Sequence, residues 1–402
     1  MKTVAGGVCA PKGFRASGVA AHIKNAKSEK PDCALIVSDA PAAAAGCFTT
    51  NLLKAAPVLW DQGVCLRGGA RAIFANSGNA NACTGDQGLA DAQATAALAA
   101  GLLGVPVTEV LVCSTGVIGL PLPMDRISDG VRRCAAALSE TGGADAARAI
   151  MTTDTVPKEL AVEVALSTGV VRLGAIAKGS GMIAPNMATM LCFITTDAKI
   201  APDALQALLA ECVADSFNRI CVDNDMSTND TVLCLANGAS GAAELIPASG
   251  DYTLFAGALR HLCRALAQSL VRDGEGATKF IEITVDGAAS DADALKVARS
   301  VAQSQLCKTA FFGQDPNWGR IACAAGYSGA AFDPAGMSVS IEGLTVVRDG
   351  CPTDYEEARA AELMKRRDLH VRVALSEGPG RAVFWTSDLS HDYVSINADY
   401  RS

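Results

Sequence analysis

Aromatic side chains are scarce in this sequence and make up only 5% of its 402 residues. A core with so few large rings must be filled by many small side chains at close spacing. Half of the residues are nevertheless apolar and 19% are charged. A chain of this composition can bury enough surface to offset the entropy lost on folding, which excludes intrinsic disorder as its main state.

An excess of positive charge is also lacking. The chain has 34 Lys plus Arg against 42 Asp plus Glu, for a formal net charge of −8. A nucleic-acid-binding protein would need a basic face to contact phosphates, so we expect no nucleic-acid partner.

Long hydrophobic runs are missing as well. The stretch from Ala97 to Val107 is interrupted by Gly and Pro and falls short of the roughly 20 residues that a membrane-spanning helix requires. The apolar stretch before Lys12 and Arg15 is too short for a secretory signal. We therefore expect no membrane association and a cytoplasmic location.

The 15 Cys and 4 His show no metal-binding spacing. No two Cys are spaced C-x-x-C, which argues against a zinc site and against a thioredoxin-type redox pair. We expect the Cys side chains to act as small buried hydrophobic groups in a reducing compartment, with no metal bound.

Helical and strand-like patterns alternate along the chain, and several strands carry almost no polar residue. This pattern predicts a mixed α/β (α+β) fold in which stacked β-sheets are enclosed by helices. Predicted strands include 71–75, 107–113, 160–166, 170–177, 189–195, 231–236, 280–285, 337–341, 370–374 and 382–385, and predicted helices include 86–103, 125–138, 201–217, 254–271, 292–305 and 355–365.

Two Gly-containing segments follow predicted strands. KGSGMIAPNMATML (178–191) does not end in the GK[ST] of a phosphate-binding loop, and it can be a tight turn that leads into a core strand. CSTGVIG (113–119) places a hydroxyl beside a backbone N–H, a pair that can stabilise an oxyanion, although Ser/Thr/Gly turns after strands are common.

A third polar segment, DNDMSTND (223–230), resembles a calcium loop only superficially. Its sixth position is Thr228 and its twelfth is Cys234, where Gly and Glu are required. A hydrogen-bonded Asp/Asn turn before a strand is the better interpretation.

No Ser-His-Asp arrangement is evident, because the sequence has no G-x-S-x-G motif to accompany its His residues. A hydroxyl nucleophile would then need another base. One solution is the nucleophile's own α-amino group, which is available only to the first residue of a chain. This requirement directs attention to Thr189, in the 178–191 segment.

Several long segments resemble the ornithine acetyltransferase family, also called bifunctional glutamate N-acetyltransferase/amino-acid acetyltransferase. The resemblance runs from about residue 7 to the last residue. The segments that carry it are GVCAPKGFRASG (7–18), PAAAAGCFTTN (41–51), ANSGNANACTG (75–85), CSTGVIG (113–119), MTTDTVPK (151–158), KGSGMIAPNMATML (178–191), DGEGATK (273–279), GQDPNWGRI (313–321) and NADYRS (397–402).

The resemblance implies a self-cleaving acyltransferase with a fold like that of N-terminal-nucleophile enzymes. The cut would fall between Ala188 and Thr189, which gives an α chain of residues 1–188 and a β chain of residues 189–402. Both chains would contribute to one folded unit, assembled further as an α2β2 heterotetramer.

The resemblance also implies the reaction and the residues that perform it. Thr189 would take the acetyl group of N-acetylornithine and pass it to glutamate in a ping-pong reaction of arginine biosynthesis. No cofactor is implied, although acetyl-CoA can serve as an alternative donor in bifunctional members. Thr115 and Gly116 match the oxyanion-stabilising pair, and the substrate-binding positions match Thr152, Lys178, Thr189, Glu275, Asn397 and Ser402, the last being Thr in many relatives.

Two alternatives remain open. A self-processed N-terminal-nucleophile amidase or aminopeptidase would share the Thr189 chemistry but would pass the acyl group to water. A non-catalytic protein could keep the fold alone, and its chain would then remain intact.

Overall fold

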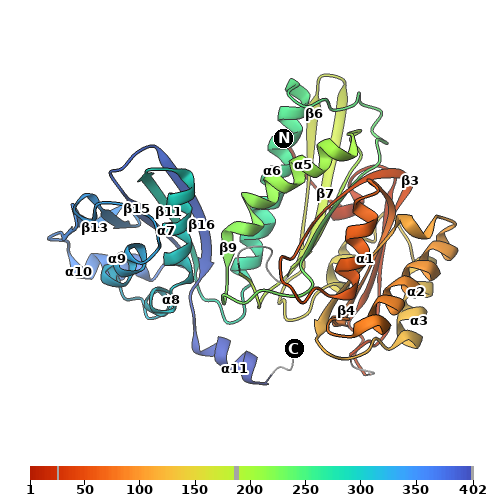
Figure 1. The fold of residues 1–402 in the computed structure, drawn as a ribbon, viewed down its shortest axis with the longest axis horizontal. Helices are drawn as coiled ribbons and strands as arrows, with labels where there is room; N and C mark the ends of the chain where they lie inside the picture. The colour runs from red at the N-terminus through yellow and green to blue at the C-terminus, as the bar shows by residue number, and fades with distance from the viewer. Residues whose placement is uncertain (25–26, 185–189, 400–402) are drawn as a thin grey trace.

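The computed structural model describes residues 1–24, 27–184 and 190–399. The chain forms two lobes, each built around one β-sheet (Figure 1). Three of the predicted site residues, Ala188, Thr189 and Ser402, lie outside the described residues.

The larger lobe contains a sheet of nine strands among the described residues, and β8 and β10 lie near its middle. Two neighbouring pairs are parallel, β8 with β10 and β4 with β5, and the other pairs are antiparallel. Along the sheet the order is β1 (Lys2–Val4), β6 (Lys158–Leu166), β7 (Gly169–Lys178), β8 (Leu191–Thr196), β10 (Thr231–Ala236), β3 (Cys33–Phe48), β4 (Gly69–Asn79) and β5 (Val110–Val117), with β2 (Phe14–Val19) paired to β3.

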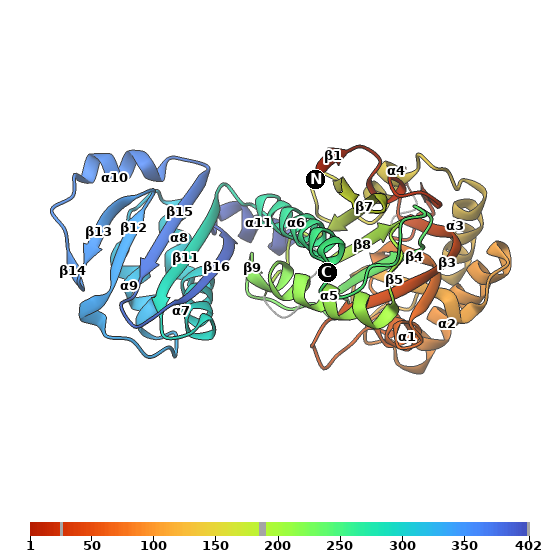
Figure 2. The same ribbon diagram turned by 90° about the horizontal axis from the view of Figure 1, so that it is seen from above.

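Helices cover both faces of this sheet, as Figure 2 shows. On one side α5 (Pro202–Ala214) and α6 (Gly250–Arg272) lie over β3, β6 and β7. Near β4 and β5 lie α1 (Ala56–Cys65) and α2 (Gly85–Leu103). Helix α3 (Met124–Ala136) packs on α2, β2 and β3, and α4 (Gly143–Ala149) also packs on β2 and β3.

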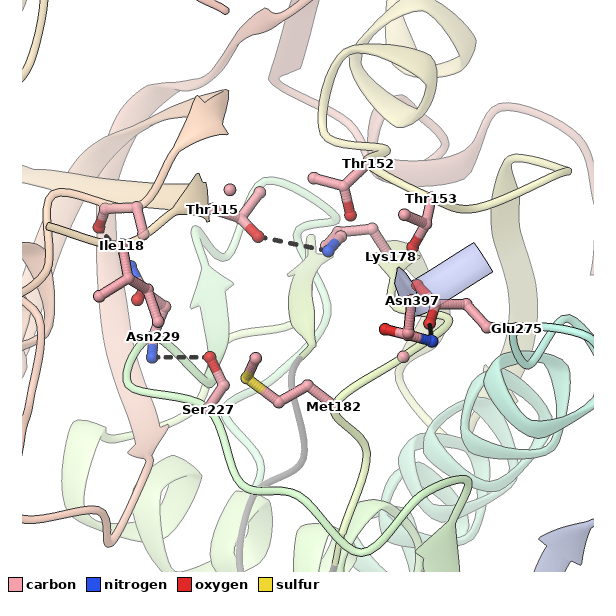
Figure 3. A pocket seen from close by; sticks show the side chains of 13 residues that line it. Thr115, Ile118, Thr152, Thr153, Lys178, Met182, Ser227, Asn229, Glu275 and Asn397 are labelled. Carbon is pink, nitrogen blue, oxygen red and sulfur yellow. Dashed lines mark hydrogen bonds between the residues drawn. The ribbon is translucent and has the colours of Figure 1, made fainter. Parts of the chain in front are cut away.

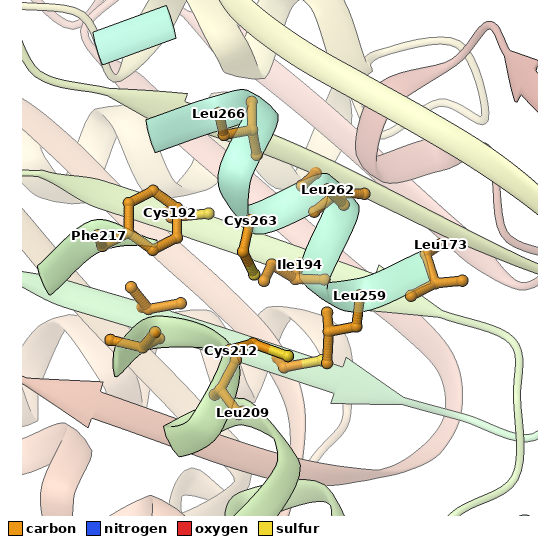
Figure 4. Close-up of a cluster of buried hydrophobic side chains, with 14 of the residues drawn as sticks. Leu173, Cys192, Ile194, Leu209, Cys212, Phe217, Leu259, Leu262, Cys263 and Leu266 are labelled. Atoms are coloured by element: carbon orange, nitrogen blue, oxygen red, sulfur yellow. The ribbon is translucent and has the colours of Figure 1, made fainter. Parts of the chain in front are cut away.

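The core explains why the first four residues of β8, Leu191 to Ile194, are all apolar. Cys192 and Ile194 point to the cluster under α5 and α6 (Figure 4), whereas Leu191 and Phe193 belong to the cluster on the opposite face. Because both faces of this strand are covered, every one of its six residues is buried.

The smaller lobe contains seven strands among the described residues. Helix α7 (Asp291–Gln303) packs across β11 and β16, beside α8 (Gln305–Phe312) and α9 (Trp318–Gly326). The strand order is β14 (Cys351–Pro352), β13 (Leu344–Arg348), β12 (Ser338–Ile341), β15 (Asp368–Ala374), β11 (Phe280–Ala288), β16 (Gly380–Ser387) and β9 (Ile220–Cys221). Helices α10 (Glu357–Met364) and α11 (His391–Asp399) complete this part of the chain.

Most predicted elements are present, and the fold is the expected arrangement of sheets enclosed by helices. Several boundaries were wrong, among them the start of the helix predicted at 254–271, which begins at Gly250, and the end of the helix predicted at 201–217, which ends at Ala214. Three further differences have a clear physical reason. The strand predicted at 71–75 continues to Asn79, because its polar residues pair with β5. The strand predicted at 107–113 starts at Val110, after a 3₁₀ turn, and extends to Val117. The helix predicted at 292–305 divides at Ser304, whose side chain caps α8.

The cysteines are all free thiols, and nine of them are buried, as predicted for small hydrophobic groups. Burial raises the pKa of the Cys134 thiol to about 12 and that of the Cys47 thiol to about 11. Cys83, Cys323 and Cys351 are exposed, contrary to that prediction.

Within residues 1–24, 27–184 and 190–399, no helix is both long and apolar enough to cross a membrane.

Candidate active site

A pocket lies where the ends of β5 and β7 meet the polar segment that precedes β10 (Figure 3). Further side chains reach it from the turn after α6 and from α11. Its lining consists of small, polar and charged residues with few apolar ones: Ala80, Thr115, Gly116, Ile118, Thr152, Thr153, Lys178, Gly181, Met182, Ser227, Asn229, Glu275 and Asn397.

Every predicted site residue that falls within the described part of the chain lines this pocket. These residues come from five separate parts of the sequence, and the fold brings them together: Thr115, Gly116, Thr152, Lys178, Glu275 and Asn397.

Thr115 and Gly116 are positioned by an irregularity between β4 and β5. Thr115 pairs with both Ser77 and Asn79, and the register shifts at Gly78. Gly116 has a φ of +133°, and a Cβ there would lie 2.3 Å from the carbonyl carbon of Gly78. Only glycine fits this close approach, which leaves the Thr115 hydroxyl and the strand backbone at the pocket.

Lys178 ends β7 with its ammonium group almost completely buried. Burial lowers its pKa, and the nearby Asp154 carboxylate opposes that effect. Its Nζ donates to the Thr115 Oγ1 over 3.3 Å, as Figure 3 shows. An ammonium has three donors, so Lys178 is suited to bind an anionic group that enters the pocket.

Asp154 joins two parts of the pocket wall and also pairs with Lys158. Its Oδ1 accepts from the Gly179 N–H and from the Lys158 Nζ, both over 2.7 Å. Its other oxygen accepts from the Thr152 N–H over 3.0 Å. Although burial alone would raise the Asp154 pKa, Lys178 and Lys158 lower it to about 2. Asp154 therefore remains a carboxylate that fixes the ends of two pocket segments.

Asp273 extends this buried ion network towards Glu275. Its carboxylate accepts from the Lys158 Nζ over 2.6 Å, and its backbone carbonyl accepts from the Ser180 hydroxyl over 2.5 Å. The Glu275 N–H in turn donates to the Ser180 carbonyl over 2.9 Å. At Gly181 a Cβ would lie 2.3 Å from the Glu275 carboxyl. The Gly-rich turn after Lys178 thus provides space for Glu275.

Asn397 approaches from α11, which follows the smaller lobe in the chain. Its Nδ2 donates to the Glu275 Oε2 over 2.8 Å (Figure 3). Both side chains are more exposed than Lys178. The pocket therefore has a buried cation at its base and a carboxylate with an amide nearer the solvent.

The 223–230 segment forms the hydrogen-bonded turn that the sequence predicted, with Asp223 accepting from the Met182, Ile183 and Asp225 amides. The sequence interpretation nevertheless missed that this segment lines the pocket. Asn229 Nδ2 donates to the Ala80 and Ser114 carbonyls over 2.6 and 2.8 Å. The only sequence signal was the density of polar residues directly before a buried strand.

The arrangement suits a small molecule that carries charges of both signs. Lys178 can pair with a carboxylate, Glu275 can receive a cation, and Thr115 with Gly116 can donate to a developing oxyanion. Within the described parts of the chain, no three His, Cys, Asp or Glu side chains are grouped so that they could hold a metal ion.

Comparisons with known proteins identify the same family that the sequence motifs resemble. The model of the ArgJ family matches residues 15–402. The arginine biosynthesis bifunctional protein ArgJ of Symbiobacterium thermophilum is 52% identical over 402 residues, with 100% of both chains covered. The protein of the same name from Geobacter sulfurreducens is 51% identical, with 97% of this chain and 99% of the relative covered.

A solved structure is also similar to part of the chain. It is the arginine biosynthesis bifunctional protein ArgJ of Bacillus halodurans, with 42% sequence identity and a TM-score of 0.50. The match covers 97% of that solved chain but 51% of this one. The solved chain is therefore about half as long as the present sequence.

Proposed function

The chain belongs to the ArgJ family, and from that premise we propose that it transfers an acetyl group from N-acetylornithine to glutamate in the cytoplasm, releasing ornithine and N-acetylglutamate for arginine biosynthesis. The observation that carries this proposal is the pocket itself. It combines the Lys178 ammonium and the Glu275 carboxylate with the Thr115–Gly116 pair. N-Acetylornithine presents the complementary carboxylate, side-chain ammonium and acetyl carbonyl.

The proposed nucleophile is the hydroxyl of Thr189. Thr189 lies between two described parts of the chain, the pocket-lining residues Gly181 and Met182 and the buried strand β8. In the proposed cleavage, this hydroxyl attacks the carbonyl of Ala188, and the resulting ester is hydrolysed by water. The half-length ArgJ chain from Bacillus halodurans supports such a division, because a cut between residues 188 and 189 also gives two chains of similar length.

The cut would free the α-amine of Thr189 to act as its own base. An α-amino group has an unperturbed pKa of about 7.7–8.0, so a neutral fraction is present near pH 7. The hydroxyl then takes the acetyl group of N-acetylornithine, ornithine leaves, and the glutamate amine collects the acetyl group. Thr115 and Gly116 would donate to the oxyanion in both half-reactions.

The remaining pocket residues would bind the amino-acid portions. We assign the substrate carboxylate to Lys178 and the side-chain ammonium of ornithine to Glu275, with Thr152, Asn397 and Ser402 supplying further hydrogen bonds. Acetyl-CoA is proposed as a second acetyl donor, since the curated relatives are named bifunctional. The assembly is proposed to be an α2β2 heterotetramer.

The decisive assay measures ornithine release from N-acetylornithine with and without glutamate. Transfer predicts that release depends on glutamate and that N-acetylglutamate forms in equal amount. Equally fast release without glutamate would instead identify a hydrolase of the amidase or aminopeptidase type. Parallel reactions with acetyl-CoA and glutamate test the second donor.

Replacing the nucleophile tests the covalent step. Thr189→Ala should give a folded chain near 41.1 kDa on denaturing electrophoresis, without transferase activity, whereas Thr189→Ser should retain some cleavage. Cleavage of the Ala variant at the normal position would show that the nucleophile is another residue.

A further inference from the structure

Asp223 contacts two separate walls of the pocket, although it is not among the residues that line it. It lies two residues after β9, and its side chain is half-buried. Its Oδ2 accepts from the Met182 N–H over 2.5 Å, and its Oδ1 accepts from the Ile183 N–H over 2.8 Å. The Val222 N–H donates back to the Ile183 carbonyl over 2.8 Å. The turn that follows β7 is therefore anchored to this carboxylate by two consecutive amides.

The anchored turn forms the wall of the pocket beside Glu275. Gly181 and Met182 line the pocket, and Gly181 leaves no room for a Cβ next to the Glu275 carboxyl. Met182 has a φ of +55°, in the left-handed region that is unfavourable for a residue with a side chain. Hydrogen bonds from two neighbouring amides to one carboxylate can hold such a backbone in place. A shift of this turn would change the space available around Glu275.

The second wall is helix α11. The Tyr393 phenol interacts with the Asp223 carboxylate, and burial together with this interaction raises the pKa of Tyr393. One helical turn later, the Asn397 Nδ2 donates to Glu275 over 2.8 Å and to the Tyr393 carbonyl over 3.1 Å. Residues four apart lie on the same face of a helix. The contact between Tyr393 and Asp223 therefore helps to set where Asn397 meets Glu275.

A carboxylate that only closed the 223–225 turn would need a single partner, the Asp225 N–H, which donates to it over 3.2 Å. Asp223 has further partners on two other elements. We propose that Asp223 is a positioning residue for substrate binding, which holds the 181–183 turn and α11 in register around Glu275. This inference rests on the proposed function, in which Glu275 receives the side-chain ammonium of ornithine.

The charge on Asp223 makes this positioning sensitive to pH. Burial raises the Asp223 pKa to about 6, three backbone amides oppose that effect, and the Asp225 carboxylate adds to it. Tyr393 of α11 and the buried Lys308 ammonium of α8 also interact with the group. Below this pKa the carboxyl gains a proton, and its protonated oxygen becomes a donor that accepts an amide poorly. Substrate binding should therefore weaken as the pH falls through about 6.

Steady-state kinetics of Asp223→Asn at saturating glutamate test the proposal. Asn keeps one oxygen that can accept a backbone amide and loses the other, together with the titratable proton. The KM for N-acetylornithine should rise about 5- to 20-fold while kcat stays within about twofold of the wild-type value, because the lost interaction serves binding. The wild-type KM should also rise as the pH falls from 7 to 5, whereas the KM of Asp223→Asn should stay constant.

Tyr393→Phe tests the contact with α11 by removing a single hydroxyl group. Its KM should rise about 2- to 5-fold, as expected for one hydrogen bond. The effect should be smaller than that of Asp223→Asn, because the Ser390 hydroxyl also anchors the start of α11 to the Gly276 carbonyl over 2.6 Å. In the Asp223→Asn background, Tyr393→Phe should raise KM little further, since both changes break the same contact.

Asp197→Asn is the matched control. Buried Asp197 also accepts two backbone amides, those of Lys12 and Arg172, but it follows the end of β8 that lies away from the pocket. Its KM should equal that of the wild type. A wild-type KM in Asp223→Asn would overturn the proposal, and so would an equal rise in Asp197→Asn. If Asp223→Asn does not fold, a wild-type KM in Tyr393→Phe or a wild-type KM that is constant from pH 7 to 5 would overturn it.

Hydrogen exchange measured by mass spectrometry separates this inference from the proposed function. In Asp223→Asn, the Met182 and Ile183 amides and helix α11 should exchange about 10-fold faster than in the wild type, while Asp197→Asn should leave both segments unchanged. A wild-type protein that releases no ornithine from N-acetylornithine would refute the proposed function, and the exchange rates alone would then decide whether Asp223 holds the two walls. Wild-type exchange of both segments in Asp223→Asn would show that it does not.

Discussion

At the scale of single residues, the pocket depends on buried charges that lie close to charges of opposite sign. Asp154 accepts hydrogen bonds from two backbone amides and the Lys158 ammonium, and its pKa falls to about 2. A depressed carboxyl pKa stabilises the fold above the unfolded value of about 4. That contribution is lost as the pH falls from about 4 through 2.

Asp154→Ala should therefore lower the free energy of unfolding by about 3–5 kcal/mol near pH 7, because it leaves the Lys158 and Lys178 charges buried with less compensation. The measurement is urea denaturation. Asp145→Ala is the control, since Asp145 forms an exposed ion pair with Arg148 and should change stability by less than about 1 kcal/mol. Equal effects of the two changes would contradict the importance of burial.

Asp61 in α1 shows the opposite shift. It is fully buried, accepts from the Val112 N–H over 2.7 Å and contacts the Cys113 thiol at 3.3 Å. Burial raises its pKa well above the usual range. The folded protein therefore holds this proton more tightly than the unfolded chain, and the resulting stabilisation is lost as the pH rises through the folded pKa.

Asp61→Asn should remove that pH dependence. Relative to the wild type, the variant should gain stability steadily from pH 5 to pH 9, as measured by denaturant melts at each pH. Asp39→Asn changes an exposed carboxyl paired with Arg15 and should show no such trend. A constant difference between Asp61→Asn and the wild type would mean that Asp61 is ionised throughout.

Sequence reasoning found the pocket residues that belong to long motifs, such as Thr115 and Lys178. It missed the roles of Asp154 and Asp273, although both lie in such motifs (151–158 and 273–279), and it missed Asn229, because an Asp or Asn in a polar stretch resembles an ordinary turn residue. Their importance comes from partners far along the chain. Lys158 and Asp273, for example, are 115 positions apart, and only the fold brings them together.

At the scale of secondary-structure elements, the hydrophobic pattern of the sequence predicted the middle of each helix or strand better than its ends. The strand 231–236 was predicted with the bounds of β10, because its apolar run is sharply delimited. The end of β4 was missed because Ser77, Gly78 and Asn79 have low strand propensity. Their pairing with β5 is a tertiary effect that depends on the close contact of Gly78 with Gly116.

We expect helix α11 to contribute more to substrate binding than to the stability of the fold. Asn397 is exposed and donates to Glu275, so Asn397→Ala should change stability by less than about 0.5 kcal/mol. Loss of this hydrogen bond in the pocket should lower kcat/KM for N-acetylornithine by about 5- to 30-fold, equivalent to roughly 1–2 kcal/mol.

Ser395→Ala on the same helix is the matched control for steady-state kinetics. Among the residues that the structure describes, its hydroxyl bonds only to the His391 carbonyl one turn earlier, so its kinetic constants should match those of the wild type. Unchanged kcat/KM in Asn397→Ala would exclude Asn397 from substrate binding.

At the scale of the whole molecule, the proposed cut would divide a single sheet. The segment 1–188 contributes β3 and β7, and the segment 189–402 contributes β8 and β10. In the sheet, β8 pairs with β7 and β10 pairs with β3. The hydrophobic clusters on both faces of the larger lobe also contain residues of both segments.

The two chains should therefore remain together after cleavage. Gel filtration in native buffer should elute both in one peak, at the same volume as uncut Thr189→Ala, and denaturant should separate them. Two native peaks would show that the shared sheet is too weak to hold the halves.

The uneven burial of the cysteines has a practical consequence. A maleimide dye added to the native protein should attach quickly at only three positions, Cys83 on the larger lobe and Cys323 and Cys351 on the smaller one. The most deeply buried thiols, shielded and poorly ionised, should react only in molecules that open transiently. Fluorophores can therefore be attached to native cysteines on both lobes. The rate at which the remaining thiols are labelled measures how often the folded protein opens transiently.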